Sequence, residues 1–201
     1  MIFYFRISFI FLLLFSSTTF AQNREKSFEQ TVYKLIKAAR EKDNKTINSL
    51  INKDYKLVTI YRIGVPDVFS FIDSIDLNWT TDYIINYHAV EVTGADYKIQ
   101  YEPLPQFECD TEKWNKPPGL YCDKNKADRV FTNAVRFYMD YEMRDNQISE
   151  KQYQLYRQLE ENSRKIILLM EDGTELCFSL TWLNGKWWFT ILDRVSSDCS
   201  A

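Results

Sequence analysis

Apolar side chains recur at the spacing of an α-helix near the start of the chain. They are Phe28, Val32, Leu35, Ile36 and Ala39. Residues three and four apart share one face of a helix, so this pattern predicts an amphipathic helix. Ser27 and Gln30 form a capping-box pattern before the apolar run, which predicts a helix start at Ser27. A second, shorter helix is predicted from Asp43 or Asn44, where apolar residues again fall on one face.

The next segments mix strand and helix patterns. Residues 55–62 are rich in aromatic and β-branched side chains and are predicted to form a strand. Gly64 ends it, and Pro66 suits the first turn of a helix, where no backbone N–H is needed. The apolar stripe predicted for this helix is Val68, Phe69, Ile72 and Ile75. Further strands are predicted over residues 83–92 and 97–102, with a turn at residues 93–96.

Residues 133–144 alternate between two sets of side chains. One set is Val135, Phe137, Met139, Tyr141 and Met143, and the other is Arg136, Tyr138, Asp140, Glu142 and Arg144. This period of two predicts a strand with one face buried. Ser149 and Gln152 then form a second capping box, which predicts a helix to about Asn162.

Two tight-turn signals, Asp172-Gly173 and Asn184-Gly185, divide the C-terminal region into three strand-like segments. Two-residue turns at both places predict an antiparallel meander of residues 165–170, 175–182 and 187–194. The predicted cross-strand pairs are Trp182 with Trp187, Leu180 with Phe189, Phe178 with Ile191, and Phe178 with Ile167. These side chains share a face that must be buried, because a one-residue slip would expose all of them.

Together these elements indicate an α+β fold, with N-terminal helices packed on a curved, mostly antiparallel sheet. This order of elements resembles the nuclear transport factor 2-like (NTF2-like) superfamily. The matching features are the helix pair at residues 28–51, the step Asp54-Tyr55 into the first strand, and the hairpin at residues 184–188. The resemblance covers about residues 28–195 and implies a cone-shaped domain with a pocket between the helices and the concave sheet face. It implies no particular activity, because the superfamily includes ketosteroid isomerases as well as non-catalytic binding modules.

Residues 1–21 differ from the rest of the chain. Arg6 is their only charged residue, residues 7–15 are almost wholly apolar, and small polar residues precede Ala21. These are the parts of a secretory signal peptide. We predict cleavage after Ala21, export to the periplasm or the extracellular space, and a single domain over residues 22–201. A membrane anchor is the weaker alternative, because the apolar run is shorter than the roughly 20 residues of a spanning helix.

Composition narrows the function classes. Residues 22–201 carry 24 basic and 28 acidic side chains, so no basic excess points to nucleic acid as a partner. A single histidine, His88, excludes a multi-histidine metal site within one chain. The sequence contains no Gly-rich phosphate loop, dinucleotide fingerprint or Gly-x-Ser-x-Gly turn. We therefore predict no metal, no cofactor, and no membrane contact once the leader is removed.

The four cysteines all follow the leader, and in an exported protein such cysteines are usually paired. Cys109 and Cys122 lie in the segment 103–128, which holds four of the five prolines and is predicted to be a long irregular loop. We predict that a Cys109–Cys122 disulfide closes it, because only 12 residues separate the two. A Cys177–Cys199 bond would require the tail to fold back along the sheet and ranks below it.

Candidate binding residues are few. Trp114 lies inside the predicted loop, away from any core pattern, and is either a binding anchor or an anchor for its own loop. The predicted strand that carries Tyr83, Tyr87 and His88 is the first candidate for a pocket wall. Asp140 and Glu142 could act as an acid–base pair, although a solvated strand face explains them more simply.

Three functions remain open. The preferred one is an exported, non-catalytic NTF2-like module that binds a small ligand or a protein partner. The alternatives are a partner-binding inhibitor or immunity-type protein acting through residues 109–122, and an isomerase- or hydrolase-like enzyme with a pocket in the sheet. The sequence specifies neither the ligand or partner nor the oligomeric state.

Overall fold

The structure is a computed structural model and describes residues 22–79, 89–94, 96–124, 129–141 and 148–199. Its helices are residues 22–40, α2 (Asn44–Asn48), α3 (Val130–Tyr141) and α4 (Glu150–Glu161). Its strands are β1 (Leu57–Arg62), β2 (Asp67–Ile72), β3 (Ile99–Tyr101), β4 (Phe107–Glu108), β5 (Lys113–Trp114), β6 (Gly119–Cys122), β7 (Ser163–Leu169), β8 (Glu175–Leu183) and β9 (Lys186–Asp193).

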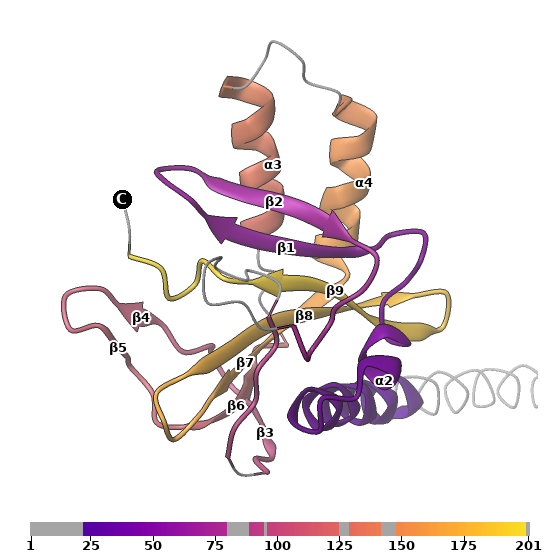
Figure 1. The fold of residues 1–201 in the computed structure, drawn as a ribbon. Coiled ribbons are helices and arrows are strands. Elements are labelled where there is room, and N and C mark those ends of the chain that lie inside the picture. Colours follow the sequence, from indigo (N-terminus) through magenta and orange to yellow (C-terminus); the bar gives the residue numbers. More distant parts are fainter. Residues whose placement is uncertain (1–21, 80–88, 95, 125–128, 142–147, 200–201) are drawn as a thin grey trace, which may run out of the picture.

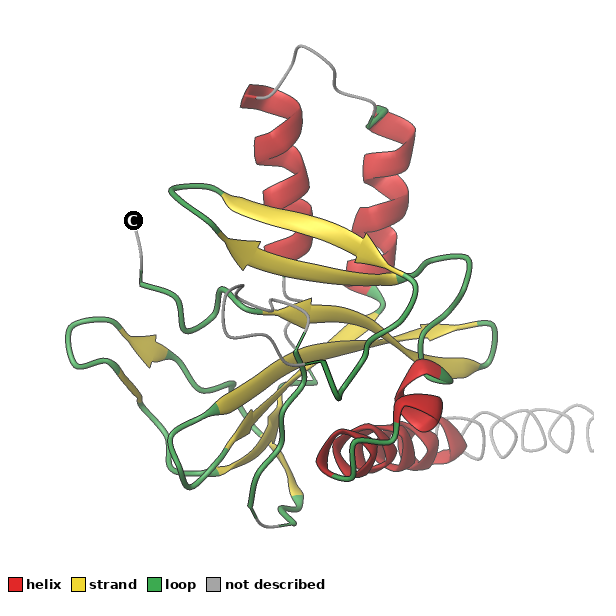
Figure 2. Cartoon of the chain, in the orientation of Figure 1, coloured by secondary structure: helices red, strands yellow, loops and turns green. Residues whose placement is uncertain are grey.

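Seven strands form one open sheet in the order β2-β1-β9-β8-β7-β6-β3. Neighbouring strands are antiparallel, except that β1 runs parallel to β9 and β3 parallel to β6. A separate two-stranded ribbon, β4–β5, extends from the side of the sheet (Figure 1). The helices lie on both sides of the sheet: residues 22–40 and α2 on one, and the α3–α4 pair on the other (Figure 2). The predicted α+β class, with two N-terminal helices on a mostly antiparallel sheet, is confirmed.

The helix of residues 22–40 covers what we call the first face of the sheet, which carries Ile166, Phe178 and Phe189. All five predicted apolar positions of this helix are buried. The predicted start at Ser27 is wrong, because residues 22–27 are already helical and Ser27 Oγ donates to the carbonyl oxygen of Arg24. Arg24 contacts side chains of the sheet, which favours helix upstream of the capping pattern. α2 begins as predicted, with Asp43 as its N-cap.

The helix predicted at residues 66–75 is a strand instead. β2 forms an antiparallel hairpin with β1, and their pairing runs from Leu57–Ile72 to Arg62–Asp67. Phe69 and Phe71 are two residues apart in β2 and therefore share a face. Both meet the ring of Phe131 edge-on, with centroids 5.5 and 6.1 Å away. The spacing of the apolar residues fits both a helix and a strand. The pairing with β1 and the ring contacts with α3 favour the strand.

The strand predicted at residues 133–144 is the helix α3 over its described part. Phe131, Ala134 and Val135 are buried at helical spacing, and Phe131 and Val135 pack with Val58 and Ile191 of the sheet. The alternation noted in the sequence is incidental, because the same residues also place an apolar stripe on one side of a helix. α4 begins as predicted, with a complete capping box between Ser149 and Gln152, and its C-cap is Asn162.

β7, β8 and β9 are consecutive antiparallel neighbours, but part of the predicted register is wrong. Trp182 lies opposite Trp187 and Leu180 opposite Phe189, as predicted. Phe178 lies opposite Leu192 rather than Ile191, because β9 has a bulge that leaves Thr190 unpaired. Phe178 lies opposite Ile166 rather than Ile167, because the first turn uses residues 171–173, with Gly173 at φ +84°, instead of two residues.

The middle of the chain is only partly as predicted. Most of the strand predicted at 83–92 falls outside the described residues, and residues 89–94 are not in a strand. The strand predicted at 97–102 is the shorter β3. The segment 103–128, predicted to be irregular, contains β4, β5 and β6. In the described part of the chain, no helix is long and apolar enough to cross a membrane.

Candidate functional site

The second face of the sheet, which carries Ile167, Cys177 and Ile191, has two separate covers. The α3–α4 pair packs on Val58, Ile60 and Ile191. Leu104 and Trp114, from the β4–β5 region, pack on Tyr121, Ile167, Leu169 and Cys177. The buried polar residues of this face include Lys165, Ser179, Thr181, Thr190 and Asp193. Lys165 and Asp193 lie next to the β4–β5 side of this polar band, and they form the candidate site.

Lys165 and Asp193 form a buried ion pair, with only 7% and 4% of each residue exposed. Lys165 Nζ donates to Asp193 Oδ2 at 2.6 Å and to Ser196 Oγ at 2.7 Å. Ser196 Oγ donates to the same aspartate oxygen at 2.7 Å. The other oxygen, Oδ1, accepts the backbone N–H groups of Val195 and Ser196 at 2.9 and 3.1 Å. Asp193 thus organises the turn of the C-terminal tail and fixes the lysine.

The electrostatics of this cluster favour the charged forms. Burial alone would raise the pKa of Asp193, but the Lys165 ammonium and the hydrogen bonds from Lys165 and Ser196 hold it below its ordinary value. Asp193 is therefore an anion at neutral pH. Burial, with a smaller contribution from Asp193, raises the pKa of the nearby Cys177 thiol well above its ordinary value. Cys177 therefore stays a neutral thiol and is a poor nucleophile.

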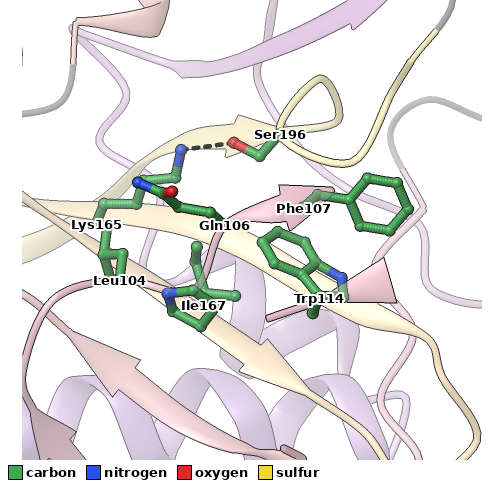
Figure 3. A pocket seen from close by; sticks show the side chains of 8 residues that line it. Leu104, Gln106, Phe107, Trp114, Lys165, Ile167 and Ser196 are labelled. Atoms are coloured by element: carbon green, nitrogen blue, oxygen red, sulfur yellow. Dashed lines mark hydrogen bonds between the residues drawn. The ribbon is translucent and has the colours of Figure 1, made fainter. Parts of the chain in front are cut away.

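A pocket of about 280 Å³ lies between the β4–β5 ribbon and this part of the sheet. It is lined by Leu104, Pro105, Gln106, Phe107, Trp114, Lys165, Ile167 and Ser196. Figure 3 shows Lys165 and Ser196 hydrogen-bonded to each other at one side and the rings of Phe107 and Trp114 at another, with Gln106 between them. The pocket therefore combines a cationic donor with an aromatic wall.

The aromatic wall is built by the pairing of β4 with β5. Phe107 lies opposite Trp114, and the two rings meet edge-on with centroids 5.4 Å apart. Asn115 fixes the ribbon, because its side chain accepts from Gln106 N at 2.9 Å and its backbone N donates to Gln106 O at 3.0 Å. Trp114 is half-buried and packs on the sheet, which favours the second of the two roles considered from the sequence, an anchor for its own loop. Its Nε1 is buried and has no hydrogen-bond partner among the described residues.

The predicted Cys109–Cys122 disulfide is wrong, because Cys109 bonds to Cys199. Cys122 lies opposite Ile166 and faces the first side of the sheet, whereas the ribbon that carries Cys109 lies over the second. Cys177 is on the second face, so Cys122 and Cys177 point to opposite sides, and both are free. The tail folds back, as Arg62 Nη1 binds the carbonyl oxygen of Asp198 at 3.0 Å. The disulfide therefore joins the ribbon to the tail, and both segments line the pocket.

The other residues singled out in the sequence do not join this site. Tyr83, Tyr87, His88 and Glu142 lie outside the described residues, and Asp140 is exposed near the end of α3. Over the described ranges, no group of three or more histidine, cysteine, aspartate or glutamate side chains could hold a metal ion. A second pocket, of about 320 Å³, includes Tyr55, Phe71 and Tyr156 in its lining and is bounded by β1, β2 and α4. Both pockets lie on the second face of the sheet. On the first face, Phe28, Phe178 and Trp187 pack between the first helix and the sheet.

Sequence reasoning missed Lys165, Asp193 and Ser196. The available signal was the two-residue period of a strand: Lys165 is two residues from Ile167 in β7, and Asp193 is two residues from Ile191 in β9, so each polar residue shares a face with a buried apolar one. A lysine and an aspartate in phase with core residues on one sheet face indicate a buried pair. Comparison with protein-family models, with curated proteins and with solved structures finds no match for this chain.

Proposed function

We propose that the protein is an exported, non-catalytic module that binds a small ligand in the pocket between the β4–β5 ribbon and the second sheet face. The observation that carries this proposal is a buried, fully organised charge cluster beside an aromatic wall in one pocket. Ligand pockets typically combine apolar area with a few fixed polar groups and measure about 300–1,000 Å³. A volume of about 280 Å³ suits a small molecule better than a peptide.

The cluster is better suited to binding than to proton transfer. For Lys165 to activate Ser196 as a nucleophile, the amine would have to be neutral. The ion pair with Asp193 at 2.6 Å favours the protonated ammonium instead. The hydroxyl of Ser196 is engaged with Asp193, and the nearby Cys177 thiol is neutral. These groups can orient a ligand, and they lack a free base.

Export and the NTF2-like relationship remain part of the proposal. A Cys109–Cys199 disulfide supports an oxidising compartment. Two N-terminal helices followed by a sheet that ends in β7, β8 and β9 support the resemblance, while β2 and α3 depart from the order expected from the sequence. The alternative of an inhibitor acting through residues 109–122 has less support, because Trp114 packs back on the sheet and Cys122 does not close that loop.

The indole N–H of Trp114 gives a direct test, because tryptophan indoles have resolved signals in ¹H–¹⁵N NMR spectra. The signal is assigned with Trp114→Phe, and the ¹⁵N-labelled, disulfide-bonded protein is screened against small polar aromatic fragments. We expect binding fragments to shift the Trp114 indole signal and to leave those of Trp182 and Trp188 in place. Fragments that shift only residues around Tyr55 and Phe71, or none that shift Trp114 at millimolar concentration, would overturn the proposal.

A further inference from the structure

We infer that the pocket selects a small carboxylate joined to a flat apolar group, an inference that rests on the ligand-binding function proposed above. The argument starts from the polar groups in the lining. They are the Lys165 ammonium, the Ser196 hydroxyl and the Gln106 amide, and no acidic side chain is among them. An ammonium only donates hydrogen bonds and an amide can donate, whereas the Ser196 hydroxyl already donates its proton to Asp193. A ligand rich in acceptors therefore matches this wall.

Of the Lys165–Asp193 pair, only the lysine is in the pocket lining. Asp193 does not line the pocket, and its Oδ1 is held by the backbone N–H groups of Val195 and Ser196. These hydrogen bonds, together with those from Lys165 and Ser196, keep the carboxylate turned towards the tail. A bound carboxylate would meet positive charge first, and a charge-assisted hydrogen bond is roughly twice as strong as a neutral one. A ligand cation would meet the lysine and be repelled.

The acidic side chains of the ribbon do not reverse this preference. Glu108, Asp110 and Glu112 are exposed, and none of them lines the pocket. Exposed charges are screened over about 8 Å at physiological ionic strength, so their repulsion of a small anion is weak at the pocket floor. They reduce the rate of encounter more than the affinity.

The apolar part of the ligand follows from the opposite wall. Phe107 and Trp114 present an edge-to-face pair, and Leu104 and Ile167 complete the apolar lining. Aromatic side chains bind flat apolar groups through offset or edge-on contacts. A volume of about 280 Å³ limits this part to a small ring system. An aromatic monocarboxylate has both features and the right size.

Benzoate and benzamide are matched probes, because they have nearly the same shape and differ in charge. We expect benzoate to shift the Trp114 indole signal with a Kd at least tenfold below that of benzamide at low salt. Gln106→Glu places a carboxylate beside Lys165, where it would compete with the ligand. The affinity for benzoate should therefore fall about tenfold and the affinity for benzamide less than twofold. Gln106 is exposed, so this change should leave the fold intact. Gln158→Glu on α4 is the control, with the same change in net charge away from the pocket lining.

The outcomes separate the two proposals. Equal binding of benzoate and benzamide, or equal effects of Gln106→Glu and Gln158→Glu on benzoate, would overturn the carboxylate preference and leave the binding function standing. Tighter binding of benzylamine than of benzoate would also overturn it. If neither probe nor any other fragment shifts the Trp114 signal, the binding function itself fails.

Discussion

Glu25 fastens the start of the first helix to the sheet. Its carboxylate accepts from both terminal nitrogens of Arg164, at 3.0 and 2.5 Å, and pairs with Lys124 at 2.8 Å. The Arg164 guanidinium also lies over the rings of Phe28 and Trp187, at 4.8 and 5.1 Å from their centroids. The hydrogen bond from Arg164 lowers the pKa of Glu25 to about 2, although burial acts in the opposite direction.

This depressed pKa makes the contribution of Glu25 to stability depend on pH. A carboxylate with a folded pKa below its unfolded value of about 4.3 stabilises the folded state above that value and loses the effect as pH falls towards 2. Glu25→Gln should lower the free energy of unfolding by about 1–2 kcal/mol at pH 7, a figure reduced for screening of a partly exposed pair. Urea denaturation should show this difference shrinking to nearly zero by about pH 2. A difference that stays constant over this range would contradict the prediction, and Glu41→Gln, in an exposed pair, is the control.

Trp114 is an anchor whose ring matters more than its N–H. Its Nε1 is buried and has no partner in the described part of the chain, so removing that donor costs little. Trp114→Phe should change the free energy of unfolding by less than about 1 kcal/mol, whereas Trp114→Ala should lower it by about 2–3 kcal/mol, because it leaves a void over Ile167 and Leu169. Urea denaturation of both variants measures this. An alanine variant as stable as the native protein would instead mean that Trp114 is a surface residue.

At the scale of elements, local signals located ends and turns better than they distinguished helix from strand. The caps at Asp43 and Ser149 and the turn at Asn184-Gly185 depend on neighbouring residues only, and the structure has all three. β2 and α3 depend on partners that are distant in the sequence, because Phe69 and Phe71 of β2 pack against Phe131 of α3. Both short apolar patterns fit either period, so tertiary packing decided between them. No turn residue in the sequence signals the bulge at Thr190.

The α3 helix is capped by a residue of α4. Glu160 is 2% exposed, and its carboxylate accepts from Phe131 N at 2.8 Å, Thr132 N at 3.0 Å and Thr132 Oγ1 at 2.6 Å. An anion at a helix N-terminus satisfies its unpaired N–H groups and interacts favourably with the helix dipole. The cap therefore couples the two helices that cover Val58 and Ile191.

Replacing this carboxylate should destabilise α3. In Glu160→Gln one oxygen becomes an NH₂ group that faces N–H donors, so the free energy of unfolding should fall by about 1–3 kcal/mol. Amide hydrogen exchange should increase first at the N-terminal turn of α3. Glu161→Gln is the matched control, because its i,i+4 pair with Arg157 is exposed and worth only about 0.3–0.5 kcal/mol. Equal effects of the two changes would show that Glu160 does not act as a cap.

At the scale of the whole molecule, the candidate site depends on the tail and the ribbon meeting over the sheet. Ser196 comes from the tail, Phe107 and Trp114 from the ribbon, and Lys165 from β7. The sequence predicts β7 as a strand but places Ile167 on the face of Phe178, whereas Ile167 lies on the second face. The return of the tail depends on Asp193, Arg62 and the disulfide partner of Cys109. Proximity in the sequence favoured Cys122 as that partner, but the pairing of β6 with β7 and the packing of Cys122 place it on the first face, away from Cys109.

The disulfide assignment predicts a specific pattern of thiol reactivity. Without reductant, peptide mapping should find Cys109 linked to Cys199, while iodoacetamide should modify Cys122 and Cys177 only in denaturant. Both thiols are buried, and burial raises the pKa of Cys122 to about 12, so little thiolate is present in the folded protein. Labelling of Cys109 in the unreduced protein, or a Cys109–Cys122 peptide, would contradict the assignment.

Reduction should loosen the pocket before it unfolds the sheet. A cross-link between residues 90 apart restricts the unfolded chain, so reducing it should lower the free energy of unfolding by about 2–5 kcal/mol. In the folded protein, hydrogen exchange should increase at residues 104–115 and 194–199, because only packing and hydrogen bonds then hold the ribbon and tail together. β7, β8 and β9 should keep their protection, since their ladders and the first-face core do not involve the disulfide. The variant Cys109→Ser/Cys199→Ser should behave in the same way without reductant. Uniform loss of protection across the sheet would mean instead that the disulfide supports the whole fold rather than the pocket.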